Sequence, residues 1–403
     1  LAAFYTGLGL IIVGTGFFKS NVSTMVGQIY REGDERRDAG FTIFYMGINL
    51  GAFIGPLICG YLAQDPRFGW HWGFAAAGVG MVLGLIVYVS ARDKYLPGIG
   101  VGTARERHAA QVQASAPGTA SEPTALHALI GAVLGGVVAY FLGGGDLLGA
   151  GTGAVIGAAL GVAILGSHGE ERKRVIALFI VVFFVVFFWA AYEQAGSSMN
   201  LFADKHTNLQ AGTFRIPSSW FQSVPALCIL IFAPIFAALW RGLGARHWEP
   251  STAMKMVLGL ALLGFGFVFM VIGGARADAG VLVSPFWLVF AYMLHTWGEL
   301  CLSPVGLSYV TKVAPARFAS LLMGVWFLAN AAADKIAGAL AAFTPTPGEP
   351  PVHVTSAMGA MIQSVSQTNR GFFTIFVVSS LGASVLMLLF VPLLKRLTSS
   401  VKA

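Results

Sequence analysis

The sequence predicts an all-α protein that crosses a membrane many times, and three observations carry this prediction. The chain has 403 residues, of which 56% are hydrophobic and only 11% are charged, whereas soluble domains carry about 25% charged residues. Apolar runs of about 20 residues, long enough to cross a bilayer core of roughly 30 Å, recur along the chain. Runs such as 175–191 lack the period-two alternation of membrane β-barrels, so these runs are predicted to be helices.

Eleven apolar spans follow from this pattern. They are predicted at residues 3–29, 40–63, 71–91, 125–143, 147–166, 175–202, 218–240, 252–274, 285–311, 319–342 and 371–394. If the first span runs from outside to inside, 17 basic residues fall in cytoplasmic segments. Only five then fall in outer segments, namely Arg67, Lys205, Arg215, Arg276 and Arg370. Since basic residues concentrate on the cytoplasmic side, we expect a multi-pass protein of the inner (plasma) membrane with a cytoplasmic C-terminus.

Composition also argues against several other classes of protein. The net charge of +7 does not predict nucleic-acid binding, because the basic residues lie in short loops between apolar spans. Cys59, Cys228 and Cys301 are isolated within apolar segments, and their spacing fits neither a metal site nor a disulfide framework. We see no metal cluster and no nucleophile with a neighbouring base, so we expect neither an enzyme nor a cofactor.

The chain changes character between residue 94 and residue 166. Residues 97–124 are rich in Ala, Ser, Pro and Gly and are interpreted as a cytoplasmic linker. In the two spans that follow, glycines recur every four residues along one helix face, at Gly131 and Gly135 in the first, and at Gly149, Gly153, Gly157 and Gly161 in the second. Small residues at this spacing let two helix backbones approach closely. A tight peripheral hairpin is predicted, and an oligomerisation face is the alternative.

Lys255 begins a predicted span on the cytoplasmic side, and five further charged residues lie inside predicted spans: Lys19, Glu193, Glu299, Asp334 and Lys335. A charge at the middle of a bilayer is costly and by default marks a substrate pathway or a proton relay. The alternative is that these charges pair with one another to hold the bundle together. Asp334 and Lys335 fit that structural role best, because adjacent residues face different sides of a helix.

Two neighbours of Glu299 are candidates for a role in gating. Pro304 lies five residues after it, and a proline inside a helix frees a carbonyl and favours a kink. His295 lies four residues before it, on the same helix face, where an imidazole could tune the proton affinity of the carboxylate. A static bend and a packed histidine are the respective structural alternatives.

Four stretches resemble the proton-dependent oligopeptide transporter (POT) family, a branch of the major facilitator superfamily. They are Gly-Thr-Gly-Phe-Phe-Lys-Ser-Asn-Val-Ser (14–23), Phe-Tyr-Met-Gly-Ile-Asn-Leu-Gly-Ala (44–52), Glu-Gln-Ala-Gly-Ser-Ser-Met-Asn-Leu-Phe-Ala (193–203) and Gly-Glu-Leu-Cys-Leu-Ser-Pro-Val-Gly-Leu-Ser (298–308). The second is similar to the family signature Phe-Tyr-x-x-Ile-Asn-x-Gly. The stretches occur in the family's order, and the resemblance covers essentially the whole chain.

The resemblance implies a fold of two six-helix halves with a two-helix hairpin inserted between them. The first three core helices of that fold are absent here. Residues 1–93 would then be the remainder of the N-terminal half (core helices 4–6), and 94–124 the cytoplasmic linker. Residues 125–166 would be the inserted Gly-rich hairpin, and 167–403 the C-terminal half (core helices 7–12). On this interpretation the chain as given would not transport by itself.

The resemblance also implies a site with two charged poles. Lys19 matches the lysine that pairs with the peptide carboxylate and with the proton-coupling acids. Glu299 matches the acid that faces the peptide amino group. Asn49 matches a donor to the peptide backbone, and Glu193 an acid near the site and the outer gate. Trp189, Trp326 and Asn330 match residues that line side-chain pockets.

The activity implied is proton-coupled symport of di- and tripeptides into the cell by alternating access. We expect a monomer whose partners are peptides, protons and the lipid bilayer, with no cofactor, metal or nucleic acid. One departure is Pro225, which stands where the family has an asparagine near the peptide amine. The alternative is a carrier of the same fold for nitrate or an organic anion, which Lys19 alone could serve, but the acid at Glu299 favours a zwitterion.

Overall fold

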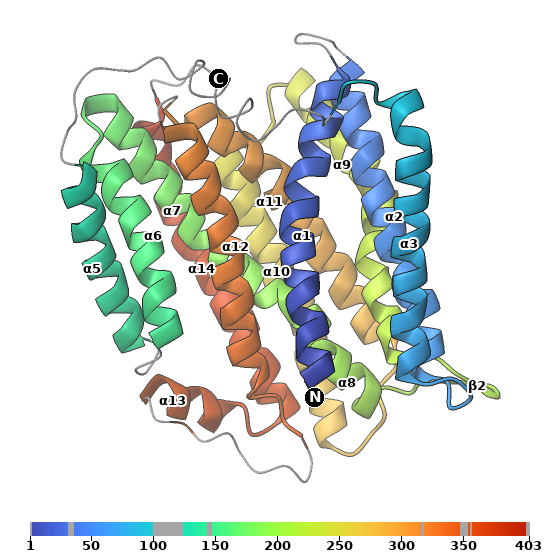
Figure 1. Cartoon of the computed structure of the whole chain (residues 1–403). Helices are drawn as coiled ribbons and strands as arrows, with labels where there is room; N and C mark the ends of the chain where they lie inside the picture. The colour runs from blue at the N-terminus through green and yellow to red at the C-terminus, as the bar shows by residue number, and fades with distance from the viewer. Residues whose placement is uncertain are drawn as a thin grey trace. The chain divides into compact units, whose positions relative to one another are not determined.

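The fold is described from a computed structural model of the chain (Figure 1). The structure describes residues 2–30, 36–99, 124–142, 147–315, 318–346, 354 and 357–399. The chain divides into two compact units, Leu1–Gly118 and Thr119–Ala403, and each unit is described by itself. Long helices account for most of the described residues, which confirms the predicted all-α class.

The first unit contains three long helices, each where the apolar pattern predicted a span. These are α1 (Ala2–Ile29), α2 (Arg36–Gln64) and α3 (Trp70–Tyr95). Helix α3 continues four residues beyond the predicted end of its span at residue 91. The segment predicted as a linker from residue 94 therefore begins with two helical residues, and most of the rest of it lies outside the described residues.

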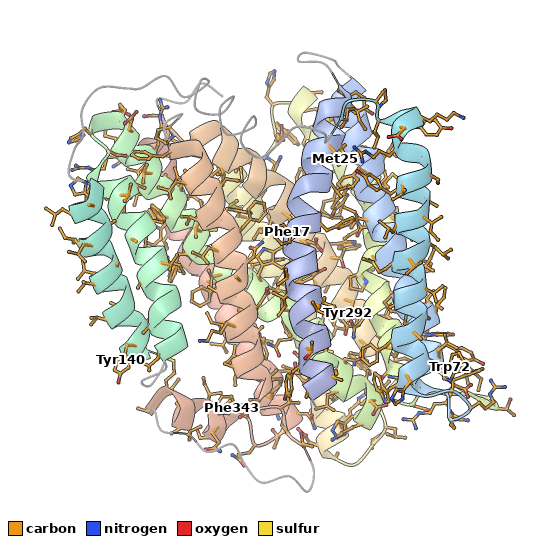
Figure 2. All side chains as sticks on the ribbon, viewed as in Figure 1. Phe17, Met25, Trp72, Tyr140, Tyr292 and Phe343 are labelled. Carbon is orange, nitrogen blue, oxygen red and sulfur yellow. The ribbon has the colours of Figure 1, made fainter. Side chains whose placement is uncertain are left out.

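Glycine sets the close packing of α2 against α3. A Cβ atom on Gly73 would lie 2.8 Å from the carbonyl oxygen of Cys59 and 2.8 Å from the Cβ of Ala63, so only glycine allows this approach. In the turn between the helices, Asp65 accepts hydrogen bonds from the backbone and guanidinium of Arg67. These bonds favour the carboxylate and lower the pKa of Asp65 to about 2. The hydroxyl of Tyr88 on α3 lies 4.0 Å from the sulfur of Met25 on α1. Figure 2 labels Met25.

The second unit begins with the predicted glycine hairpin, formed by α5 (Thr124–Leu142) and α6 (Leu147–Leu165). A Cβ on Gly135 would meet the backbone of Gly153 and lie 2.8 Å from the Cα of Gly157. A Cβ on Gly131 would lie 2.8 Å from the carbonyl carbon of Gly157 and 3.0 Å from the Cα of Gly161. The glycine faces of the two helices are thus used within the hairpin, as the four-residue spacing predicted.

The rest of the second unit is a bundle of long helices joined by short elements. The long helices are α7 (Gly169–Tyr192), α9 (Ser223–Ala245), α10 (Thr252–Asp278), α11 (Phe286–Val313), α12 (Ala319–Ala341) and α14 (Asn369–Leu397). The short elements are η1 (Glu193–Gly196), α8 (Ser198–His206), β1 (Gln210–Ala211), β2 (Phe214–Arg215), η2 (Ser218–Gln222) and α13 (Ala357–Val365). Strands β1 and β2 form a small antiparallel hairpin.

The predicted span 175–202 differs from the structure in two ways. Helix α7 begins at Gly169, six residues earlier, because the charged first turn remains helical. It then gives way to the 3₁₀ turn η1 at Glu193 and resumes as α8 at Ser198. The α-helical bonding pattern is therefore interrupted at the residue singled out as a gating candidate. Short 3₁₀ stretches within a helix often mark a hinge or strain.

Phenylalanine side chains fill the core of the second unit. Phe267 of α10 stacks on Phe376 of α14, with ring centroids 4.9 Å apart, and Phe202 of α8 meets Phe373 of α14 edge to face at 5.3 Å. Where α10 and α11 cross, a Cβ on Gly259 would lie 2.9 Å from the carbonyl oxygen of Gly298. This contact allows α10 to lie close to the segment of α11 that carries Glu299.

Six of the described helical segments are long and apolar enough to cross a membrane. They are Thr42–Gln64, Trp70–Tyr95, Gly169–His206, Ser218–Ala245, Thr252–Asp278 and Asn369–Leu397. Their mean hydropathies range from 1.6 to 2.8. Together with the family relation given below, they establish the chain as a multi-pass membrane protein.

Candidate functional site

Glu299 and Tyr192 form a side-chain hydrogen bond between two long helices of the second unit. The Tyr192 hydroxyl at the end of α7 donates a hydrogen bond of 2.5 Å to Oε2 of Glu299 on α11. Both side chains are partly buried. A carboxylate has about four lone-pair sites, so after accepting from Tyr192 it retains the capacity to bind a second donor or a cation.

Trp189 belongs to the aromatic surroundings of this contact. Its ring meets Tyr192 edge to face at 5.2 Å, while Phe188 stacks on Tyr192 at 5.7 Å. Aromatic contacts of this kind stabilise one ring orientation. The Tyr192 hydroxyl is therefore held toward Glu299 by its neighbours in α7, and the predicted site residue Trp189 lies directly beside it.

Trp326 and Asn330 lie one turn apart on α12. The indole of Trp326 is 5% exposed and packs over Gly306 of α11, where a Cβ would lie 2.7 Å from Cζ2 of the ring. Gly306 follows Glu299 by seven residues, which places it on nearly the same face of α11 at a distance of roughly 10 Å along the axis. The structure thus places Trp326 on the wall of α11 that also carries Glu299.

Asn330 contributes an unsatisfied polar atom. Its Oδ1 is buried without a hydrogen-bond partner among the described residues. Buried polar atoms nearly always form a hydrogen bond, and one without a protein partner is expected to bind a water molecule or a ligand. The assignment of Asn330 to a pocket wall stays a prediction.

Gln194 holds the interruption between α7 and α8. Its side chain is fully buried, and Nε2 donates to the carbonyls of Ala337 on α12, at 3.0 Å, and Ala190, at 3.2 Å. Its Oε1 accepts from the hydroxyl of Ser198 at 2.7 Å. The 3₁₀ turn η1 is thereby fixed to α12, although its neighbour Glu193 remains exposed.

A second hydrogen bond ties the same turn to α11. The Tyr292 hydroxyl donates to the carbonyl oxygen of Ala195 at 3.2 Å. Tyr292 lies seven residues before Glu299, so the same face of α11 contacts η1 through Tyr292 and α7 through Glu299. A displacement of α11 would therefore act on the α7–α8 junction at two points.

His295 points toward another helix. It is 1% exposed, its ring lies 4.4 Å from that of Phe267 on α10, and neither ring nitrogen has a hydrogen-bond partner among the described residues. Since the Glu299 carboxylate contacts α7, the two side chains pack against different neighbours. The gating role of His295 stays a prediction.

The remaining predicted site residues are described in less detail. Lys19 lies within α1 and Pro304 within α11, but their side chains lie outside the described part of the chain. Asn49 of α2 donates from Nδ2 to the carbonyl oxygen of Tyr45, one turn earlier, at 2.9 Å. Asp334 is exposed on α12.

Pro225, the departure from the family pattern, lies in the first turn of α9. The 3₁₀ turn η2 leads directly into α9, and the helix continues through Pro225 to Ala245. The substitution of an amide by Pro225 therefore fits the fold without a break in α9.

Sequence reasoning missed Tyr192 and Gln194. Tyr192 sits among aromatic residues of an apolar span, which is ordinary core composition, and its partner Glu299 is 107 residues away. Only tertiary packing brings them together. Gln194 is flanked by the conspicuous acid Glu193, and a buried glutamine in an apolar run was the available signal. No cluster of three or more His, Cys, Asp or Glu side chains suited to a metal occurs among the described residues.

Comparison with known proteins identifies the family. A sequence profile of the POT family matches residues 1–104 and 162–355. The chain is 41% identical over 350 residues to the uncharacterized transporter YclF of Bacillus subtilis, covering 83% of this chain and 66% of that protein. It is 36% identical over 348 residues to the peptide transporter YePEPT of Yersinia enterocolitica, covering 83% and 67%. The chain thus spans about two thirds of the length of these relatives.

Solved structures agree with the sequence matches. The chain superposes on a crystal structure of the peptide transporter POT in complex with sulfate, with a TM-score of 0.73, 35% identity and coverage of 98% of this chain and 76% of that one. A POT family transporter in complex with 5-aminolevulinic acid matches with a TM-score of 0.73 and 27% identity, covering 98% and 77%. The profile covers more than half of the chain and the relatives exceed 30% identity, so the chain belongs to the POT family of proton-dependent oligopeptide transporters.

Proposed function

We propose that the protein carries di- and tripeptides into the cell together with protons, by alternating access. The observation that carries this proposal is Glu299, an acid within a long apolar helix whose carboxylate is oriented by Tyr192. A buried acid in such a position is costly and by default functional. The names of the relatives, which include di-/tripeptide transporters of Lactococcus lactis that are 34% identical, support the same substrate class.

The charges proposed for binding fit a zwitterion. Glu299 pairs with the peptide ammonium, and Lys19 of α1 pairs with the peptide carboxylate, so one pole belongs to each half of the transporter. A peptide backbone holds its two charges at a nearly fixed separation, and both pairs are strong in a site of low dielectric. Asn49 donates to the peptide backbone.

Side chains of the peptide are accommodated by apolar walls. Trp189 and Trp326 provide broad aromatic surfaces, and the unpaired Oδ1 of Asn330 supplies an acceptor beside Trp326. Contacts to a bulky apolar surface discriminate weakly, since one methylene is worth only about 1–3 kcal/mol. A carrier built in this way accepts many peptide sequences.

Proton coupling follows from linkage between protons and peptide at the two poles. A proton on an acid near Lys19 weakens the hold of that acid on the lysine, which then binds the peptide carboxylate. Glu193, at the 3₁₀ turn between α7 and α8, takes part in closing the outer gate, while Pro304 and His295 assist the movement of α11. Binding then shifts the population of inward- and outward-facing states, with the two halves rocking about the central site.

We further propose that the carrier works as a monomer in the inner membrane with its C-terminus in the cytoplasm. The basic residues of the last turn of α14, Lys395 and Arg396, support that orientation by the positive-inside rule.

The substrate class is tested by counterflow. Protein expressed from its complete gene is reconstituted in liposomes that are loaded with unlabelled di-alanine, and entry of labelled di-alanine is followed at equal pH on both sides. We expect excess di- or tripeptide outside to abolish entry, whereas excess nitrate or acetate leaves it unchanged. Inhibition by nitrate but not by peptides would replace the peptide proposal with an anion carrier.

A further inference from the structure

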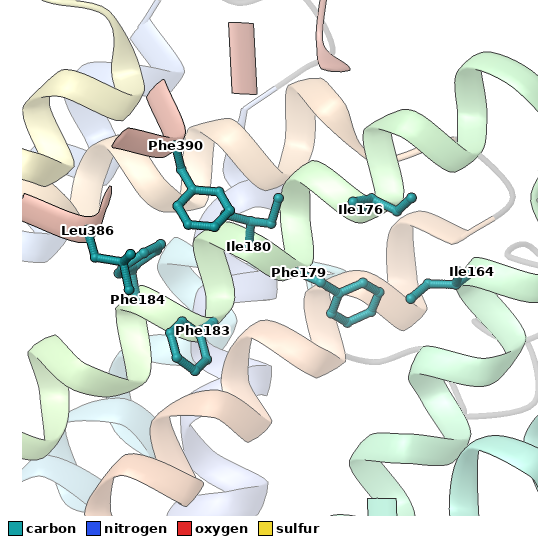
Figure 3. Close-up of a pocket in the computed structure, with 8 residues that line it drawn as sticks. All are labelled: Ile164, Ile176, Phe179, Ile180, Phe183, Phe184, Leu386 and Phe390. Atoms are coloured by element: carbon teal, nitrogen blue, oxygen red, sulfur yellow. The ribbon is translucent and has the colours of Figure 1, made fainter. Parts of the chain in front are cut away.

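An apolar groove opens on the second unit between the hairpin and the helix bundle (Figure 3). Its volume is about 330 Å³, and its walls come from α6, α7 and α14. The lining side chains are all apolar: Ile164, Ile176, Phe179, Ile180, Phe183, Phe184, Leu386 and Phe390. Two of them are substantially exposed, Phe183 at 53% and Leu386 at 43%. In helices that span a bilayer, an open groove of this composition is in contact with hydrocarbon.

Five of the side chains that line the groove follow α7 over about two turns. Ile176, Ile180 and Phe183 recur along one stripe of α7 at the spacing of successive turns. From Ile176 to Phe184 the helix rises roughly 12 Å, which approaches the thickness of one hydrocarbon leaflet, about half of a 30 Å core. Its shape therefore suits a single acyl chain lying parallel to the helices.

Helices α7 and α14 are antiparallel along this groove. Phe184 of α7 meets Phe390 of α14 at 6.0 Å, and further along the chain Phe202 of α8 meets the earlier residue Phe373 of α14 at 5.3 Å. The first turn of α7 and the last turn of α14 consequently lie at the same end of the groove.

That end is rich in positive charge. The first two turns of α7 carry Arg172, Lys173 and Arg174, and the last turn of α14 carries Lys395 and Arg396. Lys395 and Arg396 add positive charge at this end, although the helical period turns them away from the face of α14 that carries Leu386 and Phe390. By helix rise, Arg172 lies about 6 Å beyond Ile176 and on the same face of α7, four residues earlier. A charged headgroup and its acyl chain have the same relation in a phospholipid.

Two acids also lie at this end, and they reduce its positive charge only in part. Glu170 is bound to Lys173 by an ion pair of 2.5 Å, and Glu171 lies on the same turn of α7. Arg172 is oriented by a bond of 2.8 Å from Nε to the carbonyl oxygen of Ser167, at the corner between α6 and α7. A guanidinium group has five N–H donors in a fork suited to phosphate. The bond to Ser167 therefore fixes the position of Arg172 and leaves its other donors available.

We propose that the groove is a binding site for an anionic phospholipid. One acyl chain lies between α6, α7 and α14, and the headgroup phosphate is bound by Arg172. Basic pockets between membrane helices on the cytoplasmic side are suited to acidic headgroups. The site is distinct from the residues proposed for peptide binding and requires only that these helices span a membrane.

The test is retention of lipid by the complete protein. Protein solubilised from liposomes of equal parts phosphatidylglycerol and phosphatidylcholine is analysed for bound lipid by native mass spectrometry. We expect phosphatidylglycerol to be retained at least fivefold more than phosphatidylcholine. The variant Arg172→Gln should reduce this preference at least fivefold. The matched control Arg92→Gln removes one basic residue from the last turn of α3 and should leave the preference unchanged.

The groove itself is tested separately from its charges. Leu386→Trp fills it, whereas Leu389→Trp, at a 71% exposed position of the same helix outside the lining, does not. Only the former should reduce retained lipid. A phosphatidylglycerol with a photoreactive acyl chain should label wild-type peptides that contain residues 176–184 and 386–390, a result that does not depend on any variant. Absence of this labelling, or equal losses in Arg172→Gln and its α3 control, would overturn the proposal.

Discussion

Replacing Glu299 by glutamine removes a charge from the proposed peptide site and keeps the shape of the side chain. The amide oxygen can still accept the hydrogen bond that Tyr192 donates to Glu299, so the contact between α7 and α11 persists in a weaker, neutral form. What is lost is the ion pair with the peptide ammonium. Hydrogen bonds to charged groups contribute about 1.5–3 kcal/mol, which corresponds to a roughly 10- to 140-fold loss of affinity.

The assay compares two ligands in the same two proteins. Binding of Ala-Ala and of N-acetyl-Ala-Ala, which has no ammonium group, is measured by calorimetry for wild type and Glu299→Gln. We expect Glu299→Gln to weaken the binding of Ala-Ala by the factor given above, because Ala-Ala can form the ion pair. The affinity for N-acetyl-Ala-Ala, which cannot form it, should change by less than about threefold. An equal loss for both ligands would refute the assignment of Glu299 to the peptide amine.

Two further predictions concern the scaffold. Gly135→Ala should destabilise the hairpin by about 1–3 kcal/mol, because the new Cβ meets the backbone of Gly153. The effect is measured as faster hydrogen exchange of the α5 amides. Gly151→Ala, at a position with open space around it, is the control, and equal exchange rates in the two variants would contradict the packing. Gln194→Leu should lower the free energy of unfolding by about 1–3 kcal/mol in thermal denaturation, since it leaves the carbonyl of Ala337 without its buried donor. Unchanged stability would show that this bond does not hold η1.

The helices and the hairpin were predictable because their signals are local. Hydropathy marked the spans to within a few residues at most ends, and the four-residue spacing of Gly131 and Gly135 matched the close packing against Gly153 and Gly157. Such packing needs only the absence of side chains on one face, which a sequence displays directly.

The interruption at η1 was not predictable from hydropathy. Residues 193–196, Glu-Gln-Ala-Gly, lie inside a predicted span and contain no proline. The 3₁₀ turn is accompanied by bonds to distant partners, from Gln194 to Ala337 and from Tyr292 to Ala195. Tertiary contacts of this kind override local helix preference.

The sequence predicted only those residues of the candidate site that stand out by charge or by family resemblance. Glu299 was found because a charge in an apolar run stands out, and Trp326 because the chain resembles a known family. Tyr192 was missed because a tyrosine among phenylalanines carries no signal until its hydroxyl is seen on Glu299.

Accumulation of peptide above its external concentration tests whether protons drive its movement. Labelled di-alanine is supplied outside liposomes that contain the complete protein, with and without an inward proton gradient. We expect the internal concentration of di-alanine to exceed the external one only when the proton gradient is present, and a protonophore to return the two to equality. Uptake that is identical with and without the proton gradient, or absent from folded wild-type protein, would refute proton-coupled peptide transport.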